Sequence, residues 1–295
     1  MIKIGLYTSL VFCLASALFS SCTEPFDIKT DDAPSKIVIY GGLTNEITGH
    51  SIMISSTLPY FDGKSNPGVS GARVQIKSSN GIYDFVENDT VSGLYQTAKN
   101  AAGIPGIEYT LIVEVDFNRD GVTETYTAAS LMPTPVYIDS ITTRSLNIMG
   151  RKMHPVYLYA QEPPAEDYYL CSYKVNDDPV TSAISRISLL NDKMFNGQYL
   201  SAMPLRMFGD VSDKDVDREE EGRVYLNVGD KVTLSLGHIE KGYYNFILQC
   251  QNEMGGGSSF FGAPASNIIT NISNGGIGYF SCYPVMEADV IVSGD

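Results

Sequence analysis

The chain of 295 residues contains no tryptophan and only three histidines, His50, His154 and His238. None of these histidines stands beside a cysteine or a carboxylate pair at a spacing used in catalysis, and neither a Gly-x-Ser-x-Gly elbow nor a His-Glu-x-x-His motif is present. A carboxylate pair for glycoside hydrolysis would leave no such pattern, because an acidic chain offers many pairs. On this basis we expect that the protein is not an enzyme.

Basic residues are also few. The chain has 20 Lys and Arg against 34 Asp and Glu, which gives a formal net charge of −14 at pH 7. Nucleic-acid binding needs basic patches that neutralise phosphates, so we expect no nucleic-acid partner. An anionic lipid surface would repel the protein as well. Attachment to a membrane would therefore depend on a covalent anchor.

Cysteine is scarce, with five residues, and no Cys-x-x-Cys or Cys/His spacing predicts a zinc site. Two of the five lie within the first 22 positions. The other three, Cys171, Cys250 and Cys282, are an odd number, so at most one disulfide can form within the chain. Two outcomes stay open. One is a Cys250–Cys282 disulfide, since both residues lie in the C-terminal part, and the other is three buried free thiols.

Residues 1–21 form a leader with one lysine, an apolar run over residues 4–19 and the small pair Ser20-Ser21. The run is shorter than the ~20 apolar residues of a membrane-spanning helix, so it predicts a cleaved signal peptide. Because Cys22 follows the small pair directly, we expect a lipoprotein signal and a mature chain that begins at lipidated Cys22. The alternative is an ordinary secretory signal that is cut nearby. Several acyl chains on Cys22 would anchor the protein far more firmly than one chain.

After the leader, residues 22–35 are polar and aperiodic, and they predict a lipidated tether. From residue 36 onward, short runs with strand character follow one another, and several alternate apolar and polar side chains. Seven such runs with turns between them predict an immunoglobulin-like β-sandwich over residues 36–132. Prolines at positions 133 and 135 interrupt the pattern, so we place a domain boundary there.

Residues 136–295 also have mostly strand character, and they predict a second, β-rich domain. One segment differs, because Tyr243, Phe246, Ile247 and Cys250 recur at helical spacing. We expect one amphipathic helix near residues 238–254, ended by the three glycines that follow it. A stretch rich in Gly, Ser and Asn over residues 255–276 is longer than most structureless connections, which favours a functional loop.

Asp116, Asn118 and Asp120 stand at alternate positions before Gly121, which is the oxygen spacing of a calcium-binding loop. The twelfth position of such a loop is Thr127 here, where an EF-hand has a bidentate glutamate. The alternative is a hairpin turn, because the flanking runs have strand character and Asp-Gly favours the positive φ of a tight turn. We therefore expect the turn and no cofactor, and calcium at this position is the alternative.

Four aromatic residues, Tyr60, Phe61, Phe260 and Phe261, are candidates for contact with a ligand or partner, because aromatic side chains offer large, rigid contact areas. The last two lie in the glycine-rich stretch, where no sheet face claims them. Seven acids between positions 210 and 221 predict a solvated loop outside the core. The alternative for this loop is contact with a basic partner or a weak divalent site. We expect His50 and His154 in turns and His238 at the helix entrance.

Several segments of the mature chain have a distinctive order and spacing. They are Leu58-Pro59-Tyr60-Phe61-Asp62, Val69-Ser70-Gly71-Ala72-Arg73-Val74, Gly106-Ile107-Glu108-Tyr109-Thr110-Leu111, Glu162-Pro163-Pro164 before Tyr168-Tyr169, Asn196-Gly197-Gln198, Asn271-Ile272 and Gly275-Gly276-Ile277-Gly278-Tyr279-Phe280. In these segments the chain resembles the domain of unknown function 4249 family of Bacteroidota outer-membrane lipoproteins. The resemblance implies no catalytic residue.

What the resemblance implies is a lipid-anchored protein of the outer membrane, with the cell surface favoured over the periplasmic face. Such lipoproteins look like accessory or ligand-binding partners of TonB-dependent transporters in nutrient uptake. The alternative is a structural surface protein, an adhesin or a fimbria-like subunit, because sandwich domains on lipid tethers also build appendages. A polymer of that kind needs a donor strand or a sandwich with a missing strand.

Overall fold

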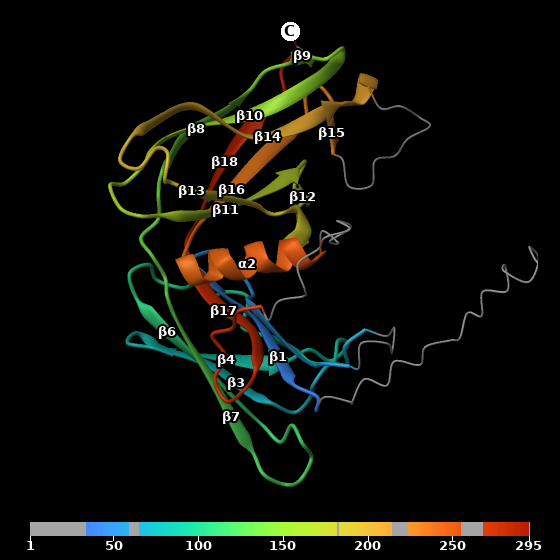
Figure 1. Ribbon diagram of the computed structural model, residues 1–295, viewed down its shortest axis with the longest axis vertical. Helices are drawn as coiled ribbons and strands as arrows, with labels where there is room; N and C mark the ends of the chain where they lie inside the picture. The colour runs from blue at the N-terminus through green and yellow to red at the C-terminus, as the bar shows by residue number, and fades with distance from the viewer. Residues whose placement is uncertain (1–33, 59–64, 182, 214–223, 255–267, 295) are drawn as a thin grey trace, which may run out of the picture. The chain divides into compact units, whose positions relative to one another are not determined.

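The structure is a computed structural model, and it describes residues 34–58, 65–181, 183–213, 224–254 and 268–294. Strands account for most of the secondary structure, and α2 (Lys241–Met254) is the one α-helix in these ranges (Figure 1). The prediction of a mostly β fold with a sandwich and one helix is therefore confirmed. Within the described part of the chain, no helix is long and apolar enough to cross a membrane.

The N-terminal strands form a sandwich with two layers. One layer contains β17, β1, β2 and β5, the other contains β4, β3, β6 and β7, and a short pairing of β5 with β4 joins them into one path. Side chains alternate between the two faces of each strand, so each layer has one face that can be buried against the other layer. In β6, for example, Tyr109, Leu111 and Val113 are buried and the residues between them are partly exposed. The strands are β1 (Ile37–Thr44), β2 (Ser51–Ser56), β3 (Arg73–Ser78), β4 (Gly81–Glu87), β5 (Leu94–Gln96), β6 (Glu108–Val115), β7 (Glu124–Leu131) and β17 (Ile277–Tyr283).

The two ends of this path, β7 and β17, are joined by side-chain hydrogen bonds. The backbone N–H of Cys282 donates to Ser130 Oγ (2.9 Å), and the N–H of Thr127 donates to Oγ of Ser273, shortly before β17 (2.7 Å). Cys282 and Phe280 are fully buried in the sandwich core. β17 therefore completes both the strand path and the core of the sandwich.

β17 corrects one part of the predicted organisation. It lies in the range 136–295 that the sequence interpretation assigned to the second domain, yet it pairs in parallel with β1 of the sandwich. Residues 133–135 do connect β7 to β8, but strand pairing crosses this point in the chain, and residues 35–295 form one compact unit. Parallel partners lie far apart in sequence, so periodicity alone does not identify them.

The rest of the chain forms two further sheets that enclose a second core. One has the order β15-β14-β10-β8 with β9 paired to β10, and the other has the order β12-β11-β16-β18 with β13 paired to β11. Buried side chains of both sheets, among them Val156, Leu158, Leu234 and Leu236, fill the space between them. The strands are β8 (Ile138–Thr143), β9 (Leu146–Ile148), β10 (Arg151–Gln161), β11 (Tyr168–Val175), β12 (Asp178–Pro179), β13 (Ser188–Asn191), β14 (Tyr199–Asp210), β15 (Tyr225–Leu226), β16 (Lys231–Ile239) and β18 (Val285–Ile291).

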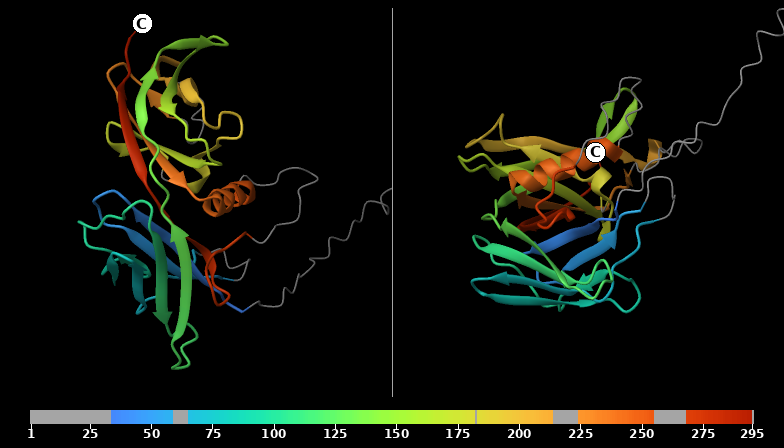
Figure 2. Two further views of the ribbon diagram at one scale, coloured as in Figure 1. Left: turned by 90° about the vertical axis from the view of Figure 1, so that its left-hand side faces the viewer. Right: turned by 60° about the horizontal axis from the view of Figure 1, so that its bottom comes forward.

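The helix α2 lies between β11 and the sandwich, as two views show (Figures 1 and 2). It buries Tyr243, Phe246 and Ile247 in a third apolar cluster with residues of β1, β11 and β17, and the hydroxyls of Tyr243 and Tyr40 lie 3.0 Å apart. The predicted apolar stripe is therefore correct. The start near residue 238 was placed too early, because β16 extends to Ile239 through its pairing with β11.

Cys171, Cys250 and Cys282 are free thiols. Cys171 is buried in the second core, Cys282 is buried in the sandwich core and Cys250 is partly exposed on α2. The Cys250–Cys282 disulfide is therefore absent, and the alternative of three buried free thiols is correct for Cys171 and Cys282 but not for the partly exposed Cys250.

Candidate functional site

Five of the predicted site residues, Cys22, Tyr60, Phe61, Phe260 and Phe261, lie outside the described residues. Lipidation at Cys22 and contact through the four aromatic side chains therefore stay predictions. The remaining predicted site residues and the buried charged groups can be placed.

Asp116, Asn118 and Asp120 lie in the turn between β6 and β7. Both carboxylate oxygens of Asp116 accept backbone N–H groups, Oδ1 from Asp120 (3.1 Å) and Oδ2 from Gly121 (3.0 Å). Asp120 Oδ1 accepts the N–H of Val122 (2.8 Å), and Gly121 has a φ of 86°. These hydrogen bonds are those of a hairpin loop over residues 116–123, in which the side chains satisfy backbone donors. Calcium binding at this turn stays a prediction.

The first member of the acidic segment 210–221 is buried, which corrects the expectation that this segment lies wholly outside the core. Asp210 ends β14, and its Oδ2 lies 2.7 Å from Nε2 of His154. His154 is fully buried in β10 and does not lie in a turn. Hydrogen bonds from Ser212 and from His154 hold the pKa of Asp210 well below its ordinary value. The pair therefore belongs to the packed interior.

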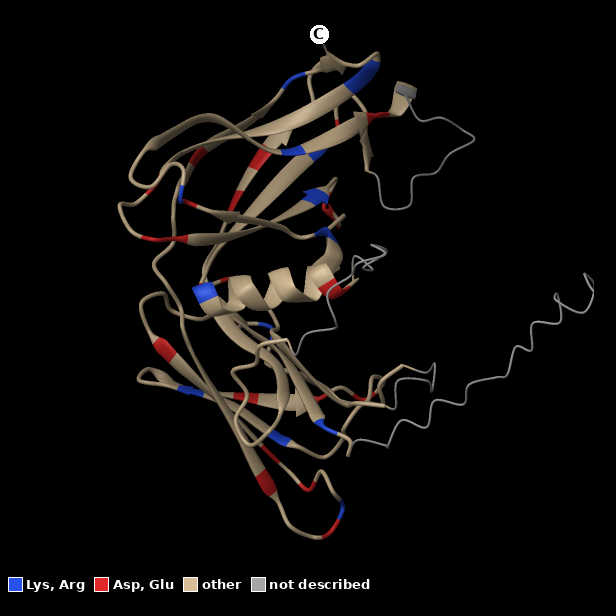
Figure 3. Cartoon of the chain, viewed as in Figure 1, with Lys and Arg blue, Asp and Glu red and all other residues tan. Residues whose placement is uncertain are grey.

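The outer face of the β8-β10-β14 sheet carries several tyrosines. β10 alternates, so Tyr157 and Tyr159 lie on the face opposite the core, and the guanidinium of Arg144 lies 5.5 Å from the ring centroid of Tyr157. Tyr137 and Tyr199, next to the same end of β10, are 68% and 53% exposed. Lys and Arg, by contrast, are spread over separate elements of the described chain (Figure 3). This aromatic face, defined by the four tyrosines, is a candidate contact surface.

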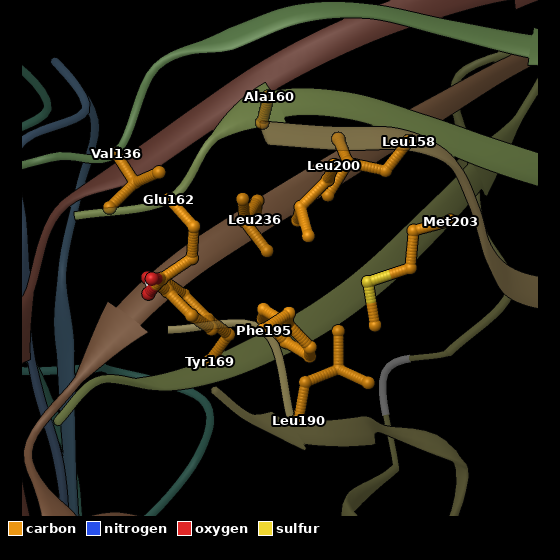
Figure 4. Close-up of a pocket in the computed structure, with 10 residues that line it drawn as sticks. All are labelled: Val136, Leu158, Ala160, Glu162, Tyr169, Leu190, Phe195, Leu200, Met203 and Leu236. Atoms are coloured by element: carbon orange, nitrogen blue, oxygen red, sulfur yellow. The ribbon is translucent and has the colours of Figure 1, made fainter. Parts of the chain in front are cut away.

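An apolar hollow lies in the second core. Leu158, Leu200 and Leu236 are among its lining residues, and Glu162 is its one charged lining residue (Figure 4). The space for the centre of a water molecule is about 10 Å³, so the hollow holds about one water and is too small for an organic ligand. The carboxylate of Glu162 and the hydroxyl of Tyr169 lie together at one edge of it.

Glu162 belongs to a group of three buried carboxylates, which we call the acidic cluster. Glu162 follows β10, Asp167 precedes β11 and Asp192 follows β13, and they are 1%, 7% and 1% exposed. The pairing of β11 with β13 places Asp167 beside Asp192, whose N–H donates to the Asp167 carbonyl oxygen (3.2 Å). One carboxylate oxygen from each acid lies within 4.8 Å of the other two.

Two members of the acidic cluster are held by donors from neighbouring elements. The Tyr169 hydroxyl donates to Glu162 Oε1 (3.0 Å), and the Gly197 N–H donates to Glu162 Oε2 (2.7 Å). Nε2 of His238 lies 3.0 Å from Oδ1 of Asp167. The register of β11 with β16 sets Tyr169 opposite His238, and it thereby brings both of these side chains to the cluster.

Two oxygens of the acidic cluster are buried without a donor. Oδ2 of Asp167 and Oδ2 of Asp192 have no hydrogen-bond partner among the residues that the structure describes. Burial raises the pKa of Glu162 against the effect of its two hydrogen bonds, and the carboxylates of Asp192 and Asp167 raise it further. Such a group of oxygen donors has the chemistry of a metal site.

The sequence interpretation missed the acidic cluster, because Asp192 comes from a later segment and meets Asp167 only through the pairing of β13 with β11. His238, expected at the helix entrance, lies in β16 instead. The available signal was an acid directly beside the end of an apolar strand, found at Glu162, Asp167 and Asp192. Two of the segments that carry the family resemblance, Glu162-Pro163-Pro164 with Tyr168-Tyr169 and Asn196-Gly197-Gln198, meet at this cluster.

The family described as Domain of unknown function (DUF4249) matches the chain over residues 23–289. The matched range includes both the sandwich and the second pair of sheets. No curated protein matches the chain.

Proposed function

The chain belongs to the family described as Domain of unknown function (DUF4249), and we propose that it is an outer-membrane lipoprotein that serves a TonB-dependent transporter as an accessory or ligand-binding partner in nutrient uptake. The family match begins at residue 23, directly after Cys22, where we expect the lipid. This order fits a folded body attached to the membrane through its N-terminus. The transporter is the partner that the family resemblance implies.

One observation favours this proposal over a fimbria-like polymer: the strand that pairs in parallel with β1, β17, belongs to the same chain. A donor-strand polymer leaves a gap in each sandwich that a neighbouring subunit fills. In this chain the position beside β1 is filled by the chain's own Ile277–Tyr283, which pairs with β1 over seven residues. A sandwich completed in this way favours a self-contained partner subunit.

The aromatic face is the surface that we expect to meet the transporter. Tyrosine is enriched in protein interfaces because it buries a large rigid ring and keeps a polar hydroxyl for hydrogen bonds. Tyr137 and Tyr199 are more than half exposed, so both rings are accessible to a partner. The face lies on a sheet whose other side is the second core, so it is a rigid platform.

The experiment is an affinity pull-down of the tagged, lipidated protein from its native outer membrane in detergent, followed by a salt wash and mass spectrometry. We expect a TonB-dependent transporter in near-equal amount. The double variant Tyr137→Ala, Tyr199→Ala should lower its recovery at least about tenfold, as loss of two interface aromatics does. The matched control Ile82→Ala, Val86→Ala changes two exposed apolar residues on β4, 57% and 73% exposed, and should leave recovery unchanged.

Recovery of the protein alone would contradict the proposal and favour a free-standing adhesin. Recovery as a ladder of its own oligomers would instead favour the appendage subunit. Equal loss of the transporter in both double variants would contradict the assignment of the aromatic face.

A further inference from the structure

The acidic cluster is short of positive charge. Three carboxylates lie within one buried site, and the basic side chain that contacts them among the described residues is His238, whose Nε2 lies 3.0 Å from Oδ1 of Asp167. Its Nδ1 lies 2.7 Å from the carbonyl oxygen of Thr134. Three ionised carboxylates beside a single positive charge would carry a net charge of −2.

Uncompensated charge of this size is costly in a protein interior, because the ions lose their hydration and the low dielectric strengthens their repulsion. A surface cluster would be solvated, but Glu162 and Asp192 are each 1% exposed. The two donor-free oxygens, Oδ2 of Asp167 and Oδ2 of Asp192, add the cost of unsatisfied acceptors. A bound cation of charge +2 would remove both costs together.

We propose that Glu162, Asp167 and Asp192 bind a divalent cation of the hard, oxygen-preferring class, with calcium as its typical member. Calcium takes oxygen ligands at about 2.3–2.6 Å, so two ligand atoms on opposite sides of one ion are roughly 5 Å apart. The separation of 4.8 Å or less between the three carboxylate oxygens meets this limit. Carboxylate ligands without a thiolate or a free imidazole favour calcium over zinc.

The groups around the three acids are arranged as supports for metal ligands. Tyr169 and Gly197 orient the carboxylate of Glu162, and His238 orients that of Asp167, which leaves the second oxygen of Asp167 and Asp192 Oδ2 for the ion. Hydrogen bonds to ligand carboxylates of this kind hold the ligands in place and raise metal affinity. The ion would join the end of β10, the start of β11 and the end of β13, and so fix the loops at one edge of the second core.

This site is distinct from the possible calcium-binding loop between β6 and β7. There, both oxygens of Asp116 already accept backbone N–H groups, whereas Asp192 has a buried oxygen without a donor. Asp192→Asn and Asp120→Asn are therefore matched variants, because each replaces one aspartate by its isosteric amide at one of the two positions.

The test uses the lipidated protein in detergent, freed of metal with EDTA and dialysed. Calcium chloride is then titrated by calorimetry, and thermal unfolding is followed with and without millimolar calcium. We expect one site in the wild-type protein, a rise in Tm on adding calcium and unchanged binding in Asp120→Asn. Asp192→Asn should lose more than the roughly 10- to 100-fold in affinity that loss of a supporting residue costs.

Asp192→Asn also has an expected effect without metal, because it removes one uncompensated charge: its metal-free Tm should be equal to or above that of the wild type. Terbium emission excited through tyrosine, and displaced by calcium, tests the wild-type protein even if the variant does not fold, since the chain has no tryptophan to compete. Absence of calcium heat, Tm shift and terbium emission in the wild type would overturn the proposal. Loss of binding in Asp120→Asn alone would overturn it as well and assign the ion to the turn.

Discussion

Substitution of Gly42 by alanine tests whether β17 is an obligatory strand of the sandwich. Gly42 lies on β1 directly opposite Ser281 of β17. A Cβ added to Gly42 would lie less than 3.0 Å from the carbonyl oxygen of Ser281, a separation that real Cβ atoms essentially never show. This oxygen belongs to the backbone, so it cannot move aside as the end of a flexible side chain could. The parallel pairing of β1 with β17 therefore needs a residue without a side chain here.

The size of the effect follows from what must move. To accept the methyl group, β17 has to withdraw by more than about 1 Å, which lengthens its hydrogen bonds to β1 beyond useful range at several of the seven paired positions. Each lost backbone hydrogen bond costs about 1 kcal/mol, and misfitting of the buried Phe280 and Cys282 adds about 1–3 kcal/mol. We expect a loss of about 3–5 kcal/mol from the free energy of unfolding, a large share of the ~5–15 kcal/mol of a typical protein.

Urea unfolding followed by circular dichroism measures this loss, with Gly49→Ala as the control. A Cβ at Gly49 would meet its nearest neighbour at 3.7 Å, an ordinary contact, so this variant should lose less than about 1 kcal/mol. Analytical centrifugation should also show self-association of Gly42→Ala, because the displaced strand leaves an open edge on β1. Equal stability of the two variants, with both monomeric, would refute the reasoning that β17 completes the sandwich.

Two further predictions concern buried polar groups. Because the pKa of Asp210 is lowered in the folded state, its carboxylate stabilises the fold above its unfolded pKa of about 3.9, and this contribution is lost as the pH falls below that value. Asp210→Asn should cost about 1.5–3 kcal/mol at pH 7, since a neutral amide replaces the carboxylate that accepts hydrogen bonds from His154 and Ser212. The variant should also show a smaller further loss between pH 5 and pH 3 than the wild type in urea unfolding, and an equally steep loss would contradict this. Burial raises the pKa of Cys171 to about 12 and also raises the pKa of Cys282, so a thiol reagent should label only the partly exposed Cys250 in the native protein and all three thiols in urea. Fast labelling of three native thiols would contradict the two buried positions.

The strands could be predicted from the sequence because their signal is local. In β3 and β6 an apolar side chain recurs at every second residue, and the structure buries these same positions. The stripe of α2 was predicted on the same ground, from Tyr243, Phe246 and Ile247 at helical spacing. Its start was not, since Ile239 has the apolar character of both the helix and the strand that precedes it.

The remaining features depend on contacts between distant parts of the chain. β17 has the pattern of a strand, but nothing in its residues indicates that its partner is β1 and not a strand of the second part. Asp210 is one of seven acids between positions 210 and 221, and only the fold reveals that His154 lies beside it. The acidic cluster is of the same kind, because strand register brings Asp167 to Asp192.

Attachment at Cys22 is the premise of the proposed function, and it can be measured directly. Intact-mass and N-terminal peptide analysis of the protein from its native host, with fractionation of the cells, should find a mature chain that begins at Cys22, carries acyl chains and lies in the outer membrane. Cys22→Ser should be released from the membrane and should no longer recover the transporter. An unmodified N-terminus, with the protein in the soluble fraction, would contradict the account of a lipid-anchored transporter partner.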